Sequence, residues 1–216
     1  MKILITAGPT REALDAVRFI SNRSSGKMGL SLAAASLAAG HDATLLLGPG
    51  PADETVPSAC RLVRFESAAD LEQLLETHWP QHQVLIMAAA VADYRPASVF
   101  DGKLSRDPDK PMTLELAPTP DLVAHVVSTK RPDQRVIAFA LEHHEALQQR
   151  ATEKLRRKGV DAIVANDLAA FEADDANALW LTAAGVKRMS GQMSKPDLAR
   201  WILRQIIADL GPQAIS

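Results

Sequence analysis

Residues 2–10 read KILITAGPT, and this stretch gives the clearest indication of the fold. A short apolar run that stops at Gly8 and Pro9 indicates a buried strand that enters a turn. The runs ATLLL at 43–47 and QVLIM at 83–87 have the same character, and small residues follow each of them. The sequence therefore predicts at least three strands that end in tight loops.

Helices and further strands alternate with these runs. Residues 24–39 are rich in Ala and Leu, so they predict a helix with Gly40 as its C-cap. The remaining predicted elements are a strand at 61–65, a helix at 68–78 capped by Ser67, a helix from Thr119 or Asp121 to Val127, a strand at 135–140, a helix at 142–158 ended by Gly159, a strand at 161–165, a hairpin with strands at 178–181 and 186–189, and a helix at 194–209.

This alternation predicts an α/β protein with a Rossmann-like, three-layer, doubly wound and mostly parallel sheet. The hairpin near the C-terminus adds antiparallel strands. No linker or internal repeat divides the chain, so we expect one domain over residues 1–216. In such a sheet, the loops at the carboxyl ends of the strands form the binding crevice.

Residues 96–118 differ from the rest of the chain. They carry four prolines and a charged stretch from Lys103 to Lys110. The flanks at 97–100 and 112–116 alternate like strands. We therefore expect a long hairpin, or flap, that projects from the sheet.

Composition excludes several classes of function. The 216 residues carry 24 Lys and Arg against 26 Asp and Glu, so a global polyanion-binding surface is not expected. Aromatic residues make up 4%, which argues against stacking on nucleic-acid bases. The single cysteine, Cys60, provides neither an internal disulfide nor a zinc cluster. Because no secretory signal and no apolar run of membrane-spanning length are present, we expect a soluble, cytoplasmic protein that binds neither nucleic acid nor membrane.

The segment at 18–29 leads into the first predicted helix and is a candidate anion site. Small residues at Ser24, Ser25 and Gly26 would let a phosphate approach the free N–H groups of a helix N-terminus. A serine N-cap on a buried helix is the alternative. The segment is not a Walker A loop, because Ser21 and Met28 stand where that motif needs Gly and Ser or Thr. The dinucleotide fingerprint G-x-G-x-x-G is also absent.

Motifs along nearly the whole chain resemble those of the phosphopantothenoylcysteine synthetase family. They are TAGPTRE at 6–12, VRFISN at 17–22, SSGKMG at 24–29, AAVADY at 89–94, Lys103, TPDLVA at 119–124, Phe139 and AND at 165–167. Members often form the C-terminal half of a fusion with a flavin-dependent decarboxylase. Because Met1 directly precedes the first strand, we expect a stand-alone synthetase or an excised domain, with a separate decarboxylase as a potential partner.

The resemblance implies a ligase that joins 4′-phosphopantothenate to L-cysteine on the route to coenzyme A. Its bacterial members typically use CTP, with Mg²⁺ accompanying the triphosphate and no metal ligands from the protein. The carboxylate attacks the α-phosphate to give an acyl-cytidylate, and the cysteine amine then releases CMP. No protein nucleophile is needed. The resemblance also implies a homodimer to which the flap contributes.

The matching positions imply roles for particular residues. Lys103 on the flap matches the lysine used to form the acyl-cytidylate, Asn22 matches the asparagine that holds the acyl region, and Arg18 matches the arginine of the second half-reaction. Asn22 is expected to bind phosphopantothenate together with Ser24, Ser25 and Gly26. The expected nucleotide-binding residues are Ala88, Ala89, Asp93, Lys103, Thr119, Pro120, Asp121, Leu122, Phe139, Lys154 and Lys158.

Two alternatives stay open at this point. A non-catalytic nucleotide-binding relative is favoured by the altered flap sequence at 103–106 and by Leu141, which stands where the family often has a small residue. An NAD(P)-dependent reductase is suggested by the first strand with Gly8. It lacks the glycine fingerprint, and Ser98 stands four positions after Tyr94 where a Tyr-x-x-x-Lys pair needs Lys.

Overall fold

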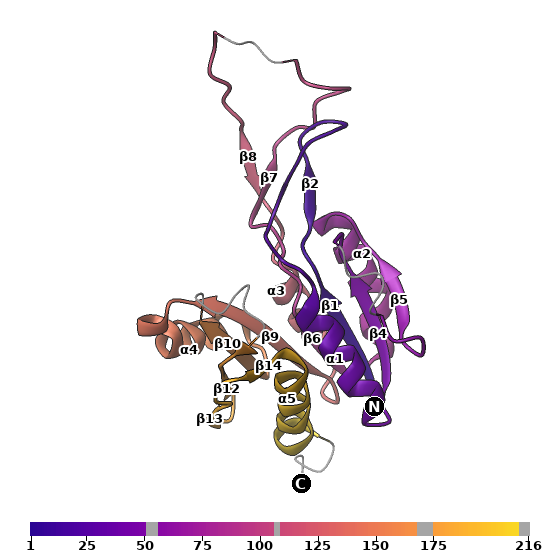
Figure 1. The fold of residues 1–216 in the computed structure, drawn as a ribbon, viewed down its shortest axis with the longest axis vertical. Coiled ribbons are helices and arrows are strands. Elements are labelled where there is room, and N and C mark those ends of the chain that lie inside the picture. Colours follow the sequence, from indigo (N-terminus) through magenta and orange to yellow (C-terminus); the bar gives the residue numbers. More distant parts are fainter. Residues whose placement is uncertain (51–55, 106–108, 168–174, 212–216) are drawn as a thin grey trace.

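The protein is described by a computed structural model that covers residues 1–50, 56–105, 109–167 and 175–211. An eight-stranded sheet forms its centre, in the order β13-β12-β10-β9-β6-β1-β4-β5 (Figure 1). The six strands from β10 to β5 are parallel, and β12 and β13 are antiparallel to their neighbours. The predicted α/β sheet with a C-terminal antiparallel hairpin is confirmed.

The strands of this sheet have the following bounds: β1 Lys2–Ala7, β4 Asp42–Leu47, β5 Arg61–Arg64, β6 Val84–Met87, β9 Arg135–Glu142, β10 Ala162–Asp167, β12 Ala178–Thr182 and β13 Lys187–Met189. The helices are α1 Lys27–Ala38, α2 Ala68–His78, α3 Leu122–Ser128, α4 Leu147–Lys158 and α5 Lys195–Leu210, with 3-10 turns η2 at Trp79–Gln81 and η3 at His144–Ala146. A further two-stranded ladder joins β11 Asp175–Ala176 to β14 Met193–Ser194.

Helices cover both faces of the sheet, which gives the predicted three layers. Side chains from α1 and α5 pack with Ile3 and Ile5 of β1 in one apolar cluster. Side chains from α2, α3 and α4 pack with Leu4 in a second cluster on the opposite face. The alternation of Ile3, Leu4 and Ile5 between the two clusters follows from the two-residue period of a strand.

The chain reverses its direction of travel across the sheet next to β1. It passes from β1 to β4 and β5 on one side, and then returns to β6 on the other side of β1. The loops that follow β1 and β6 therefore diverge, and such a switch point leaves a crevice at the carboxyl edge of the sheet.

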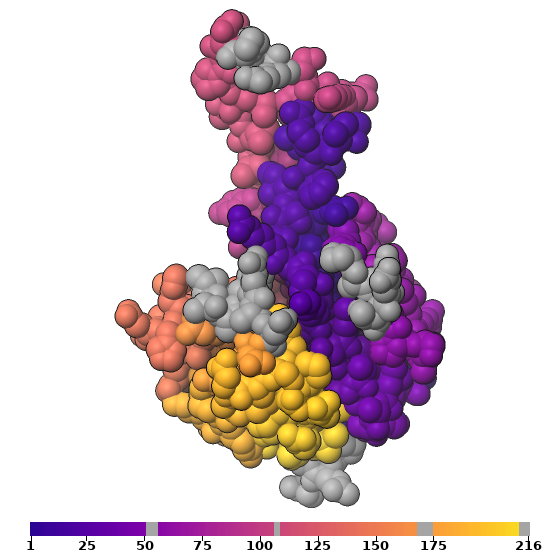
Figure 2. Space-filling model, viewed as in Figure 1, coloured from indigo at the N-terminus to yellow at the C-terminus, as the bar shows by residue number. Residues whose placement is uncertain are grey.

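Two hairpins form an arm that extends beyond this edge (Figures 1 and 2). One pairs β2 (Arg11–Ala13) with β3 (Phe19–Ser21), and the other pairs β7 (Tyr94–Pro96) with β8 (Leu116–Pro118). The predicted flap at 96–118 is thus present, but its paired strands lie at 94–96 and 116–118, so the strands expected at 97–100 and 112–116 were wrong except at Leu116. The residues at 97–100 and 112–115 are mostly exposed, so they bury little apolar surface that would stabilise a ladder. The β2–β3 hairpin was not predicted.

Local signals placed most helix ends correctly. Ser67 caps α2 with a reciprocal box, since its Oγ accepts from the Asp70 N–H at 3.1 Å and the Asp70 carboxylate accepts from the Ser67 N–H at 2.8 Å. Gly159 ends α4 with φ +65°, in the left-handed conformation that glycine adopts easily.

Two helix starts were predicted too early. The first helix begins at Lys27 instead of residue 24, because Gly26 is its N-cap with φ +72°. The predicted helix at 142–158 begins at Leu147, because β9 continues to Glu142 and η3 follows it. Leu141 and Glu142 pair with residues of β10 in the parallel ladder, and this long-range pairing outweighs their helical pattern.

Candidate active site

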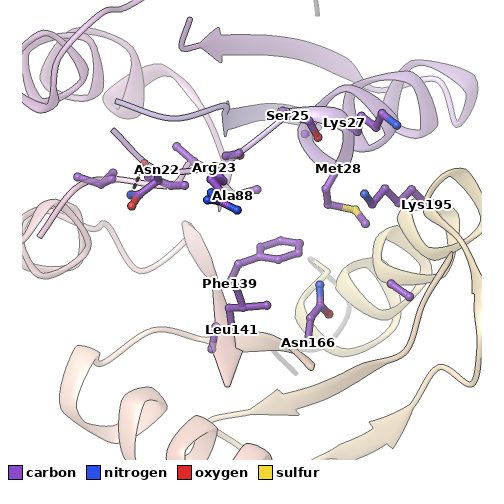
Figure 3. Close-up of a pocket in the computed structure, with 18 of the residues that line it drawn as sticks. Asn22, Arg23, Ser25, Lys27, Met28, Ala88, Phe139, Leu141, Asn166 and Lys195 are labelled. Carbon is purple, nitrogen blue, oxygen red and sulfur yellow. Dashed lines mark hydrogen bonds between the residues drawn. The ribbon is translucent and has the colours of Figure 1, made fainter. Parts of the chain in front are cut away.

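A cleft of about 890 Å³ lies at the carboxyl edge of the sheet, at the switch point between β1 and β6. It is lined by Asn22, Arg23, Ser24, Ser25, Gly26, Lys27, Met28, Gly29, Ala88, Ala89, Ala90, Val91, Asp93, Phe139, Ala140, Leu141, Lys154, Asn166, Ala176 and Lys195. The lining comes from the segment before α1, from the loop after β6, and from the ends of β9 and β10 (Figure 3).

The N-terminus of α1 forms one wall of the cleft. In the first hydrogen bond of the helix, the Leu30 N–H donates to the carbonyl of the N-cap Gly26 at 3.2 Å. The helix has no side-chain cap. The N–H groups at 27–29 therefore lack the helical partners that later residues have, and the positive end of the helix dipole faces the cleft.

Gly29 lets this helix approach β1 closely. A Cβ atom on Gly29 would lie 2.2 Å from the Cβ of Ala7, far inside van der Waals contact. Only glycine allows α1 to lie this close to β1. The close approach brings residues 24–28 to the mouth of the crevice.

The loop after β6 forms the opposite wall, and its N–H groups are occupied by the fold. The Ala88 N–H donates to the Thr6 carbonyl at 3.2 Å, and the Ala89 N–H donates to Thr6 Oγ1 at 3.1 Å. The Asn22 side chain donates to the Ala90 carbonyl at 3.1 Å, which ties the segment before α1 to this loop. Ala88 and Ala89 can therefore offer a ligand their carbonyl groups but not their N–H groups.

The ends of β9 and β10 form the floor. Phe139 and Leu141 alternate along β9 and both line the cleft. Asn166 of β10 pairs with Leu141, and its Oδ1 is buried without a hydrogen-bond partner in the described part of the chain. Figure 3 shows Phe139 and Asn166 directed into the same space, with Met28 across from them. The floor thus combines an aromatic ring with an unsatisfied amide.

Lys154 of α4 reaches the cleft from beneath β9. Its Nζ donates to the Phe139 carbonyl at 3.0 Å. Burial lowers the pKa of Lys154, while the nearby Glu142 carboxylate acts in the opposite direction. The amine is therefore held in a poorly solvated position where an anionic ligand would stabilise its charge.

The charge balance of the cleft differs from that of the whole chain. Four cationic side chains line it, namely Arg23, Lys27, Lys154 and Lys195, whereas Asp93 provides the one carboxylate among the described lining residues. The whole chain carries a formal charge of −2. This local excess of positive charge suits a polyanionic ligand.

Nine of the predicted site residues line the cleft. They are Asn22, Ser24, Ser25, Gly26, Ala88, Ala89, Asp93, Phe139 and Lys154. The others do not: Arg18 and Lys103 lie on the arm, and Thr119, Pro120, Asp121, Leu122 and Lys158 lie at the start of α3 and the end of α4.

The group at α3 is held together by its own contacts. Asp121 caps the helix by accepting from the Ala124 N–H at 3.1 Å, and Lys158 forms an ion pair with it. Burial opposes ionisation of Asp121, but the hydrogen bond from Lys158 contributes to a net lowering of its pKa. The Thr119 N–H donates to the Asp93 carbonyl at 2.9 Å, so this group adjoins the cleft. Leu122 is buried in the core, 3% exposed.

Several lining residues had no predicted role. Asn166 stood out in the sequence as a polar residue at a strand end, which was the available signal. Lys195 is far from the other lining residues in sequence, and no local pattern links it to them.

The described residues contain no group of three or more His, Cys, Asp or Glu side chains that could hold a metal ion. In the same parts of the chain, no helix has the length and apolar character needed to cross a membrane.

Known proteins resemble this chain in sequence. Residues 1–210 match the family described as the DNA/pantothenate metabolism flavoprotein C-terminal domain. The coenzyme A biosynthesis bifunctional protein CoaBC of Bacillus subtilis (strain 168) is 39% identical over 210 residues, covering 95% of this chain and 51% of the relative. CoaBC of Borreliella burgdorferi is 32% identical over 203 residues, covering 94% of this chain and 51% of that protein. The chain therefore spans about half the length of the curated relatives it matches.

Solved structures share the fold. The crystal structure of the C-terminal domain of a CoaBC protein superposes with a TM-score of 0.82 at 35% identity, covering 97% of this chain and 95% of that one. A Cab2 mutant in complex with phosphopantothenate-cysteine superposes with a TM-score of 0.78 at 19% identity, over 96% and 85% of the two chains, and shows the same fold. The resemblance drawn from the motifs is confirmed, and the chain belongs to the family of the DNA/pantothenate metabolism flavoprotein C-terminal domain.

Proposed function

We propose that this protein is a ligase of coenzyme A biosynthesis that joins 4′-phosphopantothenate to L-cysteine through an acyl-cytidylate, with CTP converted to CMP and pyrophosphate. The observation that carries the proposal is the cleft itself, where Asn22, Asp93 and Phe139 meet from three separate segments. Support also comes from the matching relatives, which are coenzyme A biosynthesis proteins.

The chemistry needs an environment that brings anions together. A carboxylate oxygen of phosphopantothenate attacks the α-phosphorus of the nucleotide, and pyrophosphate leaves. The cysteine amine then attacks the acyl carbon, loses a proton, and CMP leaves. The N–H groups at the start of α1 and the lysines of the cleft offset the repulsion between the phosphates and the carboxylate.

Each proposed residue has a role that suits its position. The start of α1 with Ser24, Ser25 and Gly26 would bind the phosphate of phosphopantothenate, and Asn22 would hold its acyl region. Phe139 offers a face for the base, and Asp93 would accept from its amino group. Thr119, Pro120, Asp121, Leu122 and Lys158 would act from the border of the nucleotide site, together with Ala88, Ala89 and Lys154.

Mg²⁺ fits this cleft as a companion of the triphosphate. Asp93 carries the one carboxylate among the described lining residues, so the phosphate oxygens would supply most of the ligands. When bound, the ion would neutralise charge on the phosphates.

Lys103 and Arg18 would act from the arm. We propose that, in a homodimer, the arm of one copy brings them to the cleft of the other. Neither lines the cleft of its own chain. The arm also exposes a group of large apolar side chains, which a second copy could cover: Val17, Phe19, Tyr94, Val99, Phe100, Met112 and Leu116. We further propose one cytoplasmic domain over residues 1–216 that works with a separate phosphopantothenoylcysteine decarboxylase.

The test is pyrophosphate release from the purified protein given 4′-phosphopantothenate, Mg²⁺ and either CTP or ATP, with and without cysteine. We expect release with CTP, and a product mass equal to the cysteine amide only when cysteine is present. Lys103→Gln should abolish release, whereas Lys110→Gln, in the same flap, should not. Silence with both nucleotides from folded, dimeric protein would contradict the proposal and favour a non-catalytic relative.

A further inference from the structure

Asp15 is a buried carboxylate at the junction of the two hairpins of the arm. Its side chain is fully buried, although the arm is largely exposed. It accepts from the N–H groups of Val17 at 2.8 Å and Arg18 at 2.7 Å, which closes the turn between β2 and β3. It also accepts from the Leu104 N–H at 3.0 Å, on the other hairpin. One carboxylate therefore joins two segments that are 89 positions apart.

The same carboxylate holds the guanidinium of Arg18. Arg18 Nε donates to Asp15 Oδ2 at 2.9 Å, and Nη2 donates to the same oxygen. Nη2 also donates to the Leu104 carbonyl at 2.8 Å. Within the described residues, Nη1 has no hydrogen bond, and 43% of the side chain is exposed. Arg18 is thus fixed in direction while one nitrogen stays open to a ligand.

Lys103 lies between two anchored neighbours. The Ala16 N–H donates to the Gly102 carbonyl at 3.0 Å, and the Leu104 N–H is bound by Asp15. The Phe100 N–H donates to the Leu14 carbonyl at 3.0 Å. Together these hydrogen bonds form a seam between residues 14–18 and the flap residues 100–104. The backbone of Lys103 is held on both sides while the side chain is exposed.

Asp15 keeps its charge throughout the range in which the protein would work. The hydrogen bond from Arg18, with those from three backbone N–H groups, outweighs the effect of burial and holds the pKa of Asp15 well below its usual range. The seam is therefore charge-assisted.

We propose that Asp15 is a positioning residue that sets Arg18 and the Lys103 segment in one fixed relation, so that one group couples the residues of the two half-reactions. The proposal rests on the proposed function for the roles of Arg18 and Lys103. The anchoring itself rests on the contacts above and can be measured without activity.

The variant Asp15→Asn keeps the size of the side chain but replaces one acceptor oxygen with a donor. Asp101→Asn is the matched control, because Asp101 is exposed on the same flap and its side chain has no hydrogen bond or ion pair among the described residues. We expect kcat of D15N to fall about 10- to 100-fold, with the KM for CTP changed less than about threefold, because misplaced groups cost turnover more than binding. The control should retain the wild-type kcat.

A double-mutant cycle separates positioning from a general structural role. If Asp15 acts through Arg18, then D15N in an Arg18→Gln background should add little to the loss in cysteine-dependent amide formation. Fully additive losses would overturn the coupling to Arg18.

Hydrogen exchange supplies the readout that is independent of activity. In D15N, the peptide spanning 100–105 should exchange faster than in the wild type and in D101N, while peptides from β1 and β6 keep their protection. Unchanged exchange at 100–105 would overturn the anchoring, and wild-type kcat in D15N would overturn the coupling. If the wild-type protein makes no product, the ligase proposal fails. The exchange result still shows whether Asp15 anchors the segment at 100–105.

Discussion

At the scale of single residues, Gly29 and Lys154 show how close helix–strand packing and side-chain charge combine to form the cleft. Gly29 permits α1 to lie against Ala7, which brings the helix N-terminus to the crevice. Lys154 then approaches from the other side of β9 and places an amine near the Phe139 carbonyl. Neither residue acts alone, because the helix dipole and the lysine charge both contribute to the positive potential of the cleft.

Gly29→Ala should move α1 away from β1, because the new Cβ would lie 2.2 Å from the Ala7 Cβ. We expect a loss of about 1–3 kcal/mol in the free energy of unfolding, as for other overpacked sites, and weaker binding of phosphopantothenate. Chemical denaturation and calorimetric titration measure the two effects. Ser31→Ala on the same helix is the control, and equal stability of the two variants would contradict the prediction.

Lys154→Gln should raise the KM for CTP by about 10- to 100-fold, since a hydrogen bond from a charged group is worth about 1.5–3 kcal/mol. Steady-state kinetics at saturating phosphopantothenate and cysteine measures the change. Arg156→Gln removes a charge from the exposed side of the same helix and does not touch the cleft. A similar KM in both variants would show that only the overall charge matters.

At the scale of elements, the His82 side chain holds the turn before β6 at the amino edge of the sheet. The His82 ring follows η2, where one nitrogen contacts the His78 carbonyl at 2.7 Å and the other contacts Thr44 Oγ1 of β4 at 3.0 Å. Burial lowers the pKa of both His78 and His82, and the nearby Arg61 adds to the effect. The folded state therefore favours the uncharged form of both imidazole rings.

The stability of the protein should fall with acid in a defined window. The ordinary pKa of 6.5 applies to the unfolded chain, and the folded values lie below it. The stabilisation is thus complete above about pH 6.5 and is lost as pH falls through the folded pKa values, with a slope of about 1.4 kcal/mol per pH unit for each histidine. Thermal unfolding from pH 8 to 5 measures it.

His82→Gln should flatten this pH dependence, because it removes one of the histidines whose pKa burial lowers. His143→Gln is the control, since His143 is exposed. An unaltered slope in H82Q would mean that other groups govern the acid response.

At the scale of the whole molecule, the sheet and the arm have separate tasks. The sheet carries the cleft at its switch point, and the arm extends beyond the carboxyl edge (Figure 1). Arg18, between β2 and β3, and Lys103, between β7 and β8, belong to the arm. The apolar side chains exposed on the arm stand apart from the core, which is closed on both faces of the sheet. An isolated chain therefore leaves the arm incompletely covered.

We expect Phe19→Asp combined with Val99→Asp to convert the proposed homodimer into a folded monomer with little ligase activity, because two charges would enter the apolar surface proposed as the contact. Sedimentation velocity and circular dichroism measure mass and folding. Met189→Asp on the distant edge strand β13 is the control. A dimer that persists in the double variant would contradict the assignment of the arm.

Mixing two impaired variants, assayed at a CTP concentration well below the KM of Lys154→Gln, tests the same arrangement through catalysis. Lys103→Gln lacks the flap amine, and Lys154→Gln has a damaged cleft. If the arm of one copy serves the cleft of the other, mixed dimers regain one intact site. No recovery after subunit exchange would show that each chain uses its own arm.

Local patterns were enough to predict much of the molecule. The apolar runs and their terminating loops predicted the parallel strands, and Ser67 and Gly159 predicted helix ends, because capping involves groups within a few residues. The motif at 24–29 lines the cleft, as expected of a site before α1, and the binding of an anion there stays a prediction.

Contacts between distant segments decided the rest. The start of α4 moved to Leu147 because Leu141 and Glu142 pair with β10. The β2–β3 hairpin is joined to the flap through Asp15 and Leu104, and no local pattern reveals this contact. Asn166 and Lys195 reach the cleft because β10 lies beside β9 and α5 packs beside α1. Sequence alone determined those elements and ends for which neighbouring residues supply the free energy. Burial and pairing between remote segments determined the other ends and which residues share the site.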